Sequence, residues 1–342
     1  MEAVVYRGAR RFEIENRVAE APATGQVAIE VAYTGICGTD LHIYHGDMDS
    51  RVGPAAVIGH EMSGRVAAIG DEVSGWSVGQ PVTVMPTLSC GRCAACQGWN
   101  QHICHAMNFL GIDSPGAMQS IWNVPADLVF ALPDTLRLHD AALVEPVAVA
   151  VHDVRRARIG IGDHVVVVGG GPVGVLIAIL SRHRGARVVL VEPNPFRRTV
   201  ARRIGLRAVD PRTTDVVALV NERTAGAGAD VAFEVSGAAG GVNTAVDVLA
   251  TRGRLVMVAI HPQPRPVDLH RFFWRELELF GARLYQRADI AEAIRLIDTG
   301  AIPAQHLISQ TRPVREVDAA FTALEKGADV MKVLLEWQGI AQ

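Results

Sequence analysis

The sequence predicts an α/β protein with two domains, one mostly β and one built on a doubly wound parallel sheet. Three observations support this prediction. The chain has 342 residues, which is too long for one ordinary domain and suits two domains, each with its own core. Residues 1 to about 146 contain short alternating segments separated by Gly and Pro. From about residue 147, strand-like apolar runs alternate with helix-like stretches.

The individual elements follow from these patterns. Alternating segments of the first part predict strands, for example at residues 27–32, 64–69 and 80–84. Apolar runs of the second part predict strands at residues 164–168, 187–191, 230–235 and 254–258. Helix-like stretches between these runs are typical of βαβ units, which build parallel sheets. After about residue 281, we expect helices at 289–299 and 317–326 and a last strand at 331–336.

The composition excludes several classes of partner. A net charge of −3 gives no basic surplus for binding nucleic acid or an anionic membrane. Apolar runs are interrupted well before the roughly 20 residues that a membrane span requires. The N-terminus lacks the basic and apolar regions of a secretory signal. We therefore expect a cytoplasmic protein whose partner is a small molecule.

A glycine-rich turn, Gly-Gly-Gly-Pro-Val-Gly, follows directly after the first strand of the parallel sheet. Gly169 permits a tight turn, Gly171 lets the backbone approach a pyrophosphate, and Gly174 allows the next helix to pack closely. Pro172 and Val173 lie where that helix begins, and a helix N-terminus favours phosphate charge. The strand, turn and helix together predict a dinucleotide-binding site of the Rossmann type.

An acidic residue, Glu192, ends the second strand, eighteen positions after Gly174. A carboxylate there accepts a hydrogen bond from the ribose 2′-hydroxyl of NAD and repels the 2′-phosphate of NADP. The sequence therefore favours NAD. Arg197 and Arg198 leave NADP open as an alternative, because either guanidinium could pair with a phosphate.

Four of the five cysteines lie within fifteen residues, at spacings that fit one tetrahedral zinc ion. They are Cys90, Cys93, Cys96 and Cys104. Because no His or carboxylate lies among them at ligand spacing, they predict a closed structural site. A second, dispersed set contains Cys37, then His60 with Glu61, and then Glu145 before a proline. Taken singly, these residues are typical of core or surface positions.

From Cys37 onward, the sequence resembles the zinc-containing medium-chain alcohol dehydrogenases. Residues 59–73 read Gly-His-Glu-x2-Gly-x5-Gly-x2-Val, which matches the zinc signature of that family at every fixed position. The Cys37 segment, the four-cysteine loop and the glycine turn follow in the family's order and spacing. The resemblance covers nearly the whole chain and implies two zinc ions per subunit, one catalytic and one structural.

The resemblance also implies an arrangement of domains. Residues 1–146 and 281–342 would form a GroES-like catalytic domain that binds zinc, and residues 147–280 would form the NAD-binding Rossmann domain. The active site would lie between them. Members of the family form homo-oligomers, so we expect a dimer or a tetramer, paired through the edge strand near residues 276–281.

The Glu-Pro pair at Glu145 is similar to the sorbitol, polyol and butanediol dehydrogenase branch. The resemblance implies that Cys37, His60 and one carboxylate, Glu61 or Glu145, bind the catalytic zinc, with the other carboxylate bound directly or through water. It further implies that Thr39 and His42 pass the substrate proton to solvent. We expect Asp40 to be structural and to order the loop or a zinc ligand.

The substrate expected from this branch is a polyol, a sugar acid or a vicinal diol, oxidised at a secondary hydroxyl. Candidate substrate contacts are Tyr44, Trp122, Arg283 and Tyr285. Two alternatives stay open: an L-threonine 3-dehydrogenase, and an inactive zinc-stabilised binding or structural protein on the same scaffold. The retention of a complete set of open-site ligands argues against the inactive scaffold.

Overall fold

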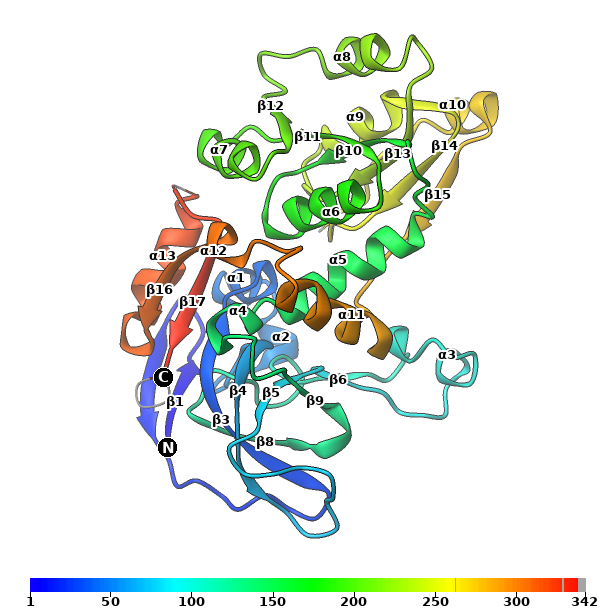
Figure 1. Ribbon diagram of the computed structural model, residues 1–342. Helices are drawn as coiled ribbons and strands as arrows, with labels where there is room; N and C mark the ends of the chain where they lie inside the picture. The colour runs from blue at the N-terminus through cyan, green and yellow to red at the C-terminus, as the bar shows by residue number, and fades with distance from the viewer. Residues whose placement is uncertain (262, 328, 338–342) are drawn as a thin grey trace. The chain divides into compact units, whose positions relative to one another are not determined.

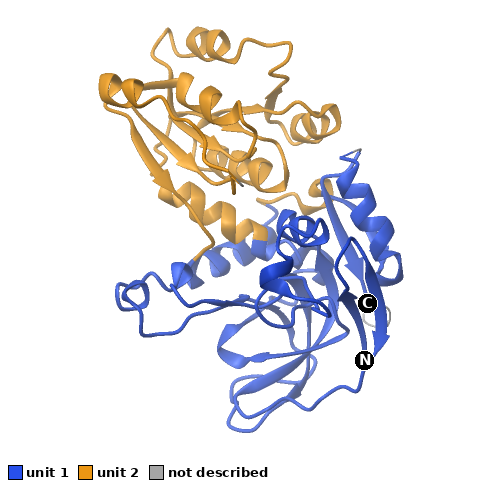
Figure 2. Cartoon of the chain, turned by 180° about the vertical axis from the view of Figure 1, so that it is seen from behind, with its two compact units in different colours: residues 1–145, 286–300, 308–342 blue, residues 146–285, 301–307 orange. Residues whose placement is uncertain are grey.

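The computed structural model describes residues 1–261, 263–327 and 329–337. The chain forms two compact units, which Figure 2 shows in separate colours. Unit 1 contains residues 1–145, 286–300 and 308–342, and unit 2 contains residues 146–285 and 301–307. The sequence placed the end of the Rossmann domain at residue 280, whereas this segment of unit 2 continues to residue 285. The Ala282 N–H donates a hydrogen bond to the Met257 carbonyl, which extends the pairing of two strands of unit 2 past residue 281.

Unit 2 is built on a parallel sheet with the strand order β12-β11-β10-β13-β14-β15 (Figure 1). Its strands are β10 (His164–Val168), β11 (Arg187–Val191), β12 (Arg207–Val209), β13 (Ala229–Glu234), β14 (Leu249–Met257) and β15 (Glu278–Gly281). The order reverses between β10 and β13, which is the point where doubly wound sheets bind ligands. This topology confirms the predicted fold class, although β14 begins five residues before the predicted strand at 254.

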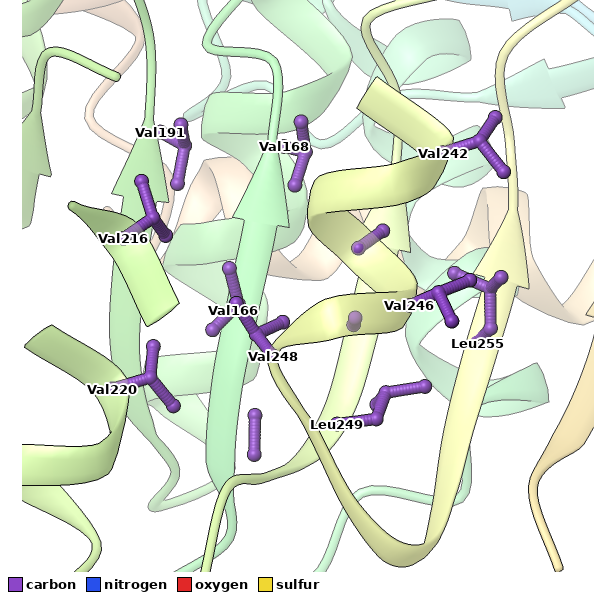
Figure 3. Close-up of a cluster of buried hydrophobic side chains, with 13 residues drawn as sticks. Val166, Val168, Val191, Val216, Val220, Val242, Val246, Val248, Leu249 and Leu255 are labelled. Carbon is purple, nitrogen blue, oxygen red and sulfur yellow. The ribbon is translucent and has the colours of Figure 1, made fainter. Parts of the chain in front are cut away.

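Helices pack on both faces of this sheet. Val166 and Val168 of β10 face the helices α8 and α9 in a cluster of buried apolar side chains (Figure 3). Val167 points to the other face, where it lies beside Gly174 of α6. The helices of this part of the chain are α5 (Val144–Arg156), α6 (Pro172–His183), α7 (Pro195–Arg203), α8 (Val216–Arg223), α9 (Gly241–Asp247) and α10 (Leu269–Arg275). Burial on both faces explains why the strands are continuously apolar.

Unit 1 is built on a mostly antiparallel sheet with the order β16-β17-β3-β4-β5-β9, in which β8 also pairs with β3. These strands are β3 (Gln26–Gly35), β4 (Glu61–Ile69), β5 (Pro81–Val84), β8 (Ile121–Pro125), β9 (Val129–Ala131), β16 (Ile308–Pro313) and β17 (Lys332–Glu336). Two smaller pairs join β1 (Glu2–Tyr6) to β2 (Phe12–Asn16) and β6 (Thr87–Leu88) to β7 (Asn108–Phe109). The helices are α1 (Gly38–Tyr44), α2 (Asp49–Val52), α3 (Ala94–Gln97), α4 (Leu138–Ala141), α11 (Arg287–Asp298) and α13 (Val317–Glu325), and α12 (Ala304–Leu307) belongs to unit 2.

Strand β3 connects segments from opposite ends of the chain. It pairs with β4, so that Gly35 lies opposite Glu61, and with β17, so that Gly35 also lies opposite Leu334. The chain then turns from the end of β3 into α1. These pairings bring three segments together at one end of the sheet. Among the residues that the structure describes, no helix combines the length and apolar character needed to cross a membrane.

Candidate functional site

Three of the dispersed ligand candidates meet at the end of β3. One ligand atom each from Cys37, His60 and Glu61 lies within 4.8 Å of the others. Cys37 is the N-cap residue of α1, while His60 and Glu61 lie where the chain enters β4. His60 and Glu61 are buried, whereas Cys37 is partly exposed. A thiolate, an imidazole and a carboxylate form the mixed S, N and O donor set of a catalytic zinc site, so these side chains fit the metal.

Asp40 supports two of these ligands. Its Oδ2 accepts a hydrogen bond of 2.8 Å from the Cys37 backbone N–H, which caps α1, and its Oδ1 lies 3.7 Å from Nδ1 of His60. Burial raises the pKa of Asp40, although His60 and the Cys37 N–H oppose this shift. Burial also opposes protonation of His60, but the charge of Asp40 and the hydrogen bond to Cys37 outweigh it and raise the His60 pKa well above its ordinary value. The position of Asp40 matches the expected structural role.

Glu145 lies outside the group of three atoms that could share one metal ion. It is buried at the first turn of α5, and its charge contributes to the raised pKa values of His60 and Lys332. The sequence left Glu61 and Glu145 as equivalent candidates for the carboxylate ligand. The structure groups Glu61 with Cys37 and His60 and makes Glu145 a nearby negative charge.

The sequence did not indicate a further charged group of this site, Lys332. Its Nζ forms an ion pair with Oε2 of Glu61 and donates a hydrogen bond of 3.0 Å to the Ile36 carbonyl. Burial lowers the pKa of Lys332, but the charges of Glu61 and Cys37 outweigh burial and raise it. The sequence carries one signal for this residue, which is the rarity of lysine: Lys326 and Lys332 are the only lysines among the 33 Lys and Arg residues.

Thr39 and His42 share one face of α1, because they are three residues apart in a helix. The imidazole of His42 is 47% exposed, and its Nδ1 lies 3.0 Å from Oδ2 of Asp47. Asp47 was not among the residues predicted from the sequence. This placement is compatible with proton transfer from the Thr39 hydroxyl to the His42 imidazole and then to solvent. The relay assigned to Thr39 and His42 stays a prediction.

The four clustered cysteines lie together on a separate loop. Their sulfur atoms are within 4.8 Å of one another. Sγ of Cys93 lies 3.5 Å from Sγ of Cys96 and 3.8 Å from Sγ of Cys104. Backbone N–H groups of His105 and Cys96 lower the pKa of Cys93 to about 6, which favours the thiolate that binds metal. Four soft sulfur donors at these distances fit a structural zinc ion.

The glycine turn has the geometry that its sequence requires. Gly169 has a φ of 108°, which favours glycine, and a Cβ at Gly174 would lie only 1.9 Å from the Gly169 carbonyl oxygen. A Cβ at Gly171 would meet only Arg197, at 3.8 Å. Gly169 and Gly174 therefore shape the turn and its packing. The open side of Gly171 is free for a ligand, and Pro172 and Val173 begin α6 beside it.

Glu192 is held against this turn. Its Oε2 accepts a hydrogen bond of 2.7 Å from the Gly170 N–H, and its Oε1 accepts one of 2.7 Å from the Asn194 N–H. Each carboxylate oxygen keeps a second lone pair with which it can accept from a ribose hydroxyl. The carboxylate is therefore oriented before a nucleotide binds.

The two arginines after Glu192 differ. Arg198 is engaged by the Glu192 and Pro193 carbonyls and by the Asp210 carboxylate. Nη1 of Arg197 lies near Gly171, and its buried Nε has no hydrogen-bond partner among the described residues. Arg197 thus lies where it could contact a bound nucleotide. Arg198 instead binds the backbone that follows β11.

The four candidate substrate residues lie in different environments. The Tyr44 ring stacks on Phe12 and is 7% exposed, and Trp122 is 2% exposed with its indole N–H donated to the Pro115 carbonyl. Both side chains pack in the core of unit 1, and the contacts with substrate that were expected of them stay a prediction. Arg283 is exposed and Tyr285 is fully buried. They differ because Leu284 between them has a φ of 57°.

Comparisons with known proteins agree with this geometry. The family model described as "Alcohol dehydrogenase GroES-like domain" matches residues 23–134, and the one described as "Zinc-binding dehydrogenase" matches residues 172–299. The chain is 46% identical to a 2-dehydro-3-deoxy-L-galactonate 5-dehydrogenase of Pseudoalteromonas atlantica, over 98% of each protein. It is 31% identical to a sorbitol dehydrogenase of Halalkalibacterium halodurans, over 98% of this chain and 99% of that protein. A zinc-binding dehydrogenase from Sinorhizobium meliloti, bound to NADP, has a solved structure that matches with a TM-score of 0.92 and 29% identity, over 98% of each chain.

Proposed function

Because the chain belongs to the zinc-dependent medium-chain alcohol dehydrogenase family, we propose that it oxidises a secondary hydroxyl of a sugar acid and transfers the hydride to NAD. It is an oxidoreductase that acts on CH–OH groups and uses zinc and a nicotinamide cofactor. The observation that carries the choice of a sugar acid is the full-length 46% identity to the galactonate-derivative dehydrogenase. By that likeness, the substrate is a 2-dehydro-3-deoxy sugar acid and the reacting hydroxyl is at C5.

The residues at the end of β3 have distinct tasks in this reaction. Cys37, His60 and Glu61 would hold the catalytic zinc, and the Asp40 carboxylate lies 3.7 Å from Nδ1 of His60, where its negative charge favours a proton on that nitrogen. Bound zinc supplies a Lewis acid, which lowers the pKa of a hydroxyl as it lowers that of water from about 15.7 to about 7. Thr39 accepts the released proton and His42 delivers it to solvent.

Replacing His42 with Ala is expected to lower kcat by roughly 100-fold, because the released proton then has no imidazole to carry it to solvent. Added imidazole should restore part of the rate. The pH profile of kcat, with and without imidazole, measures both effects. His45→Ala is the matched control, because this nearby histidine pairs with Glu325 and should keep the wild-type profile. An unchanged profile in His42→Ala would remove His42 from the relay.

We propose NAD as the cofactor because the Glu192 carboxylate lies at the glycine turn and Arg198 is engaged elsewhere. Glu192→Gln keeps an acceptor and removes the negative charge. It is expected to lower kcat/KM for NAD by about tenfold and to raise it for NADP, since a hydrogen bond to a charged group contributes about 1.5–3 kcal/mol. Parallel assays with the two cofactors measure the ratio. A wild-type enzyme that prefers NADP would contradict the assignment.

A substrate panel tests the proposed substrate class. NADH formation would be followed with 2-dehydro-3-deoxy-L-galactonate, idonate, sorbitol, xylitol, galactitol, 2,3-butanediol and threonine. We expect the highest kcat/KM with a sugar acid. Polyol oxidation is the second candidate, supported by the 31% identity to a sorbitol dehydrogenase. A clear preference for threonine would instead support the threonine dehydrogenase alternative. Absence of turnover with all seven compounds, in protein that contains zinc, would favour an inactive scaffold.

We further propose a homo-oligomer, a dimer or a tetramer, that works in the reducing cytoplasm with two zinc ions in each subunit. Strand β15 ends the sheet of unit 2, and large apolar side chains are exposed on and near it. These are Leu269, Phe273, Trp274 and Leu279. An exposed strand edge with apolar neighbours favours pairing with a second copy. The free thiols of the zinc sites support a reducing compartment. Size-exclusion chromatography with light scattering gives the subunit number.

A further inference from the structure

A buried amine lies beside the catalytic metal ligands. Lys332 is 2% exposed at the first residue of β17, whereas the other lysine, Lys326, is exposed at the end of α13. A buried charge is costly unless it is paired. The chain uses arginine for nearly all its basic positions, so a compact ammonium at this one buried position points to a specific task.

The pairing of β17 with β3 determines where the amine lies. Leu334 is opposite Gly35, so Lys332 extends past the end of β3 and reaches the backbone of Ile36. From there its Nζ donates to the Ile36 carbonyl and pairs with Oε2 of Glu61. The ammonium therefore contacts the carboxylate that belongs to the metal-ligand group.

A glycine leaves the space that the same carboxylate oxygen occupies. A Cβ at Gly35 would lie 2.2 Å from Oε2 of Glu61 and 3.2 Å from its Cβ. The φ of Gly35 is outside the left-handed region, so the space taken by the Glu61 side chain requires glycine here. Gly35 leaves room for Oε2 of Glu61, and the Lys332 ammonium pairs with it there.

We propose that Lys332 is a positioning residue for the metal site: it holds Oε2 of Glu61 over Gly35 and so makes Glu61 a weak, displaceable ligand. This inference rests on the zinc site of the proposed function and is independent of the substrate.

The test compares zinc release from wild-type protein, Lys332→Met and the control Lys326→Met. Without the ammonium, both oxygens of Glu61 are free to bind zinc, and the carboxylate is unpaired when zinc is absent. We expect zinc to leave for a chromophoric chelator about tenfold more slowly or slower still, which corresponds to about 1.4 kcal/mol in the barrier to release. The metal-free variant should also melt at a lower temperature than metal-free wild type. Cys37→Ser protein identifies the release phase of the four-cysteine site.

Two further variants separate positioning from general damage. Gly35→Ala displaces Oε2 without changing any charge and should also slow zinc release. In a Glu61→Gln background, Lys332→Met should have little further effect. Unchanged or faster release in Lys332→Met, or equal slowing in the Glu61→Gln background, would overturn the proposal. If Lys332→Met fails to fold, Gly35→Ala decides: slowed release supports the proposal, and wild-type release overturns it. Zinc release is read without substrate, so the result stands even if every substrate in the panel fails.

Discussion

Replacing Cys37 with Ser is expected to remove one zinc ion from each subunit and to abolish NADH formation. Cys37 supplies the only thiolate of the group formed with His60 and Glu61, and it lies outside the four-cysteine loop. Loss of the metal leaves the substrate hydroxyl with a pKa near that of water, so kcat should fall on the order of 10⁴-fold or more.

Metal analysis and activity together check this expectation. The wild-type protein should contain two zinc ions per subunit, and Cys37→Ser should keep one, in the loop of Cys90 to Cys104. Cys93→Ser is the complementary variant, since it should lose the loop zinc and lower the melting temperature. Full zinc content in an inactive Cys37→Ser protein would contradict the ligand assignment.

A pair of glycine substitutions in the turn after β10 is expected to separate folding from nucleotide binding. Gly174→Ala places a methyl group 1.9 Å from the Gly169 carbonyl oxygen, so backbone has to move. It should destabilise the protein by about 3 kcal/mol and lower its Tm by roughly 6–12 °C. Gly171→Ala meets only the Arg197 side chain at 3.8 Å, so the Tm should stay close to wild type.

The same pair should differ in binding. The methyl group of Gly171→Ala occupies the open side of the turn, where the pyrophosphate of NAD approaches. We expect the Kd for NADH, measured by fluorescence titration, to rise by about tenfold or more, because 1.4 kcal/mol of lost contact is a factor of ten. Wild-type NADH affinity in Gly171→Ala would place the pyrophosphate elsewhere.

Local patterns explain what the sequence predicted well. The predicted strands at 164–168 and 187–191 match β10 and β11 because a parallel strand buried on both faces is a continuous apolar run. The glycine turn and the four-cysteine loop are also local, and each needs few neighbouring residues to define its geometry. Glu192 could be predicted from its separation in sequence from the glycine turn, and its carboxylate does accept a hydrogen bond from the Gly170 N–H.

Long-range pairing explains what the sequence missed. The grouping of Glu61, rather than Glu145, with Cys37 and His60 depends on how β4 pairs with β3, and the position of Lys332 depends on how β17 pairs with β3. No local sequence pattern carries that register. Tyr44 was predicted to contact the substrate because it follows the relay histidine, and Trp122 because related enzymes often carry an aromatic residue at its position. Whether such an aromatic side chain faces a ligand or the core depends on packing from distant segments, such as Phe12 against Tyr44.

Zinc-assisted hydride transfer to NAD is the central step of the proposed function, and one assay tests it directly. NADH formation from the best substrate of the panel would be measured before chelation, after removal of the catalytic zinc, and after addition of zinc or magnesium. We predict loss of activity on chelation and recovery with zinc but not with magnesium, because a thiolate and imidazole site binds zinc selectively. Full activity in protein that metal analysis shows to be free of zinc would contradict the account.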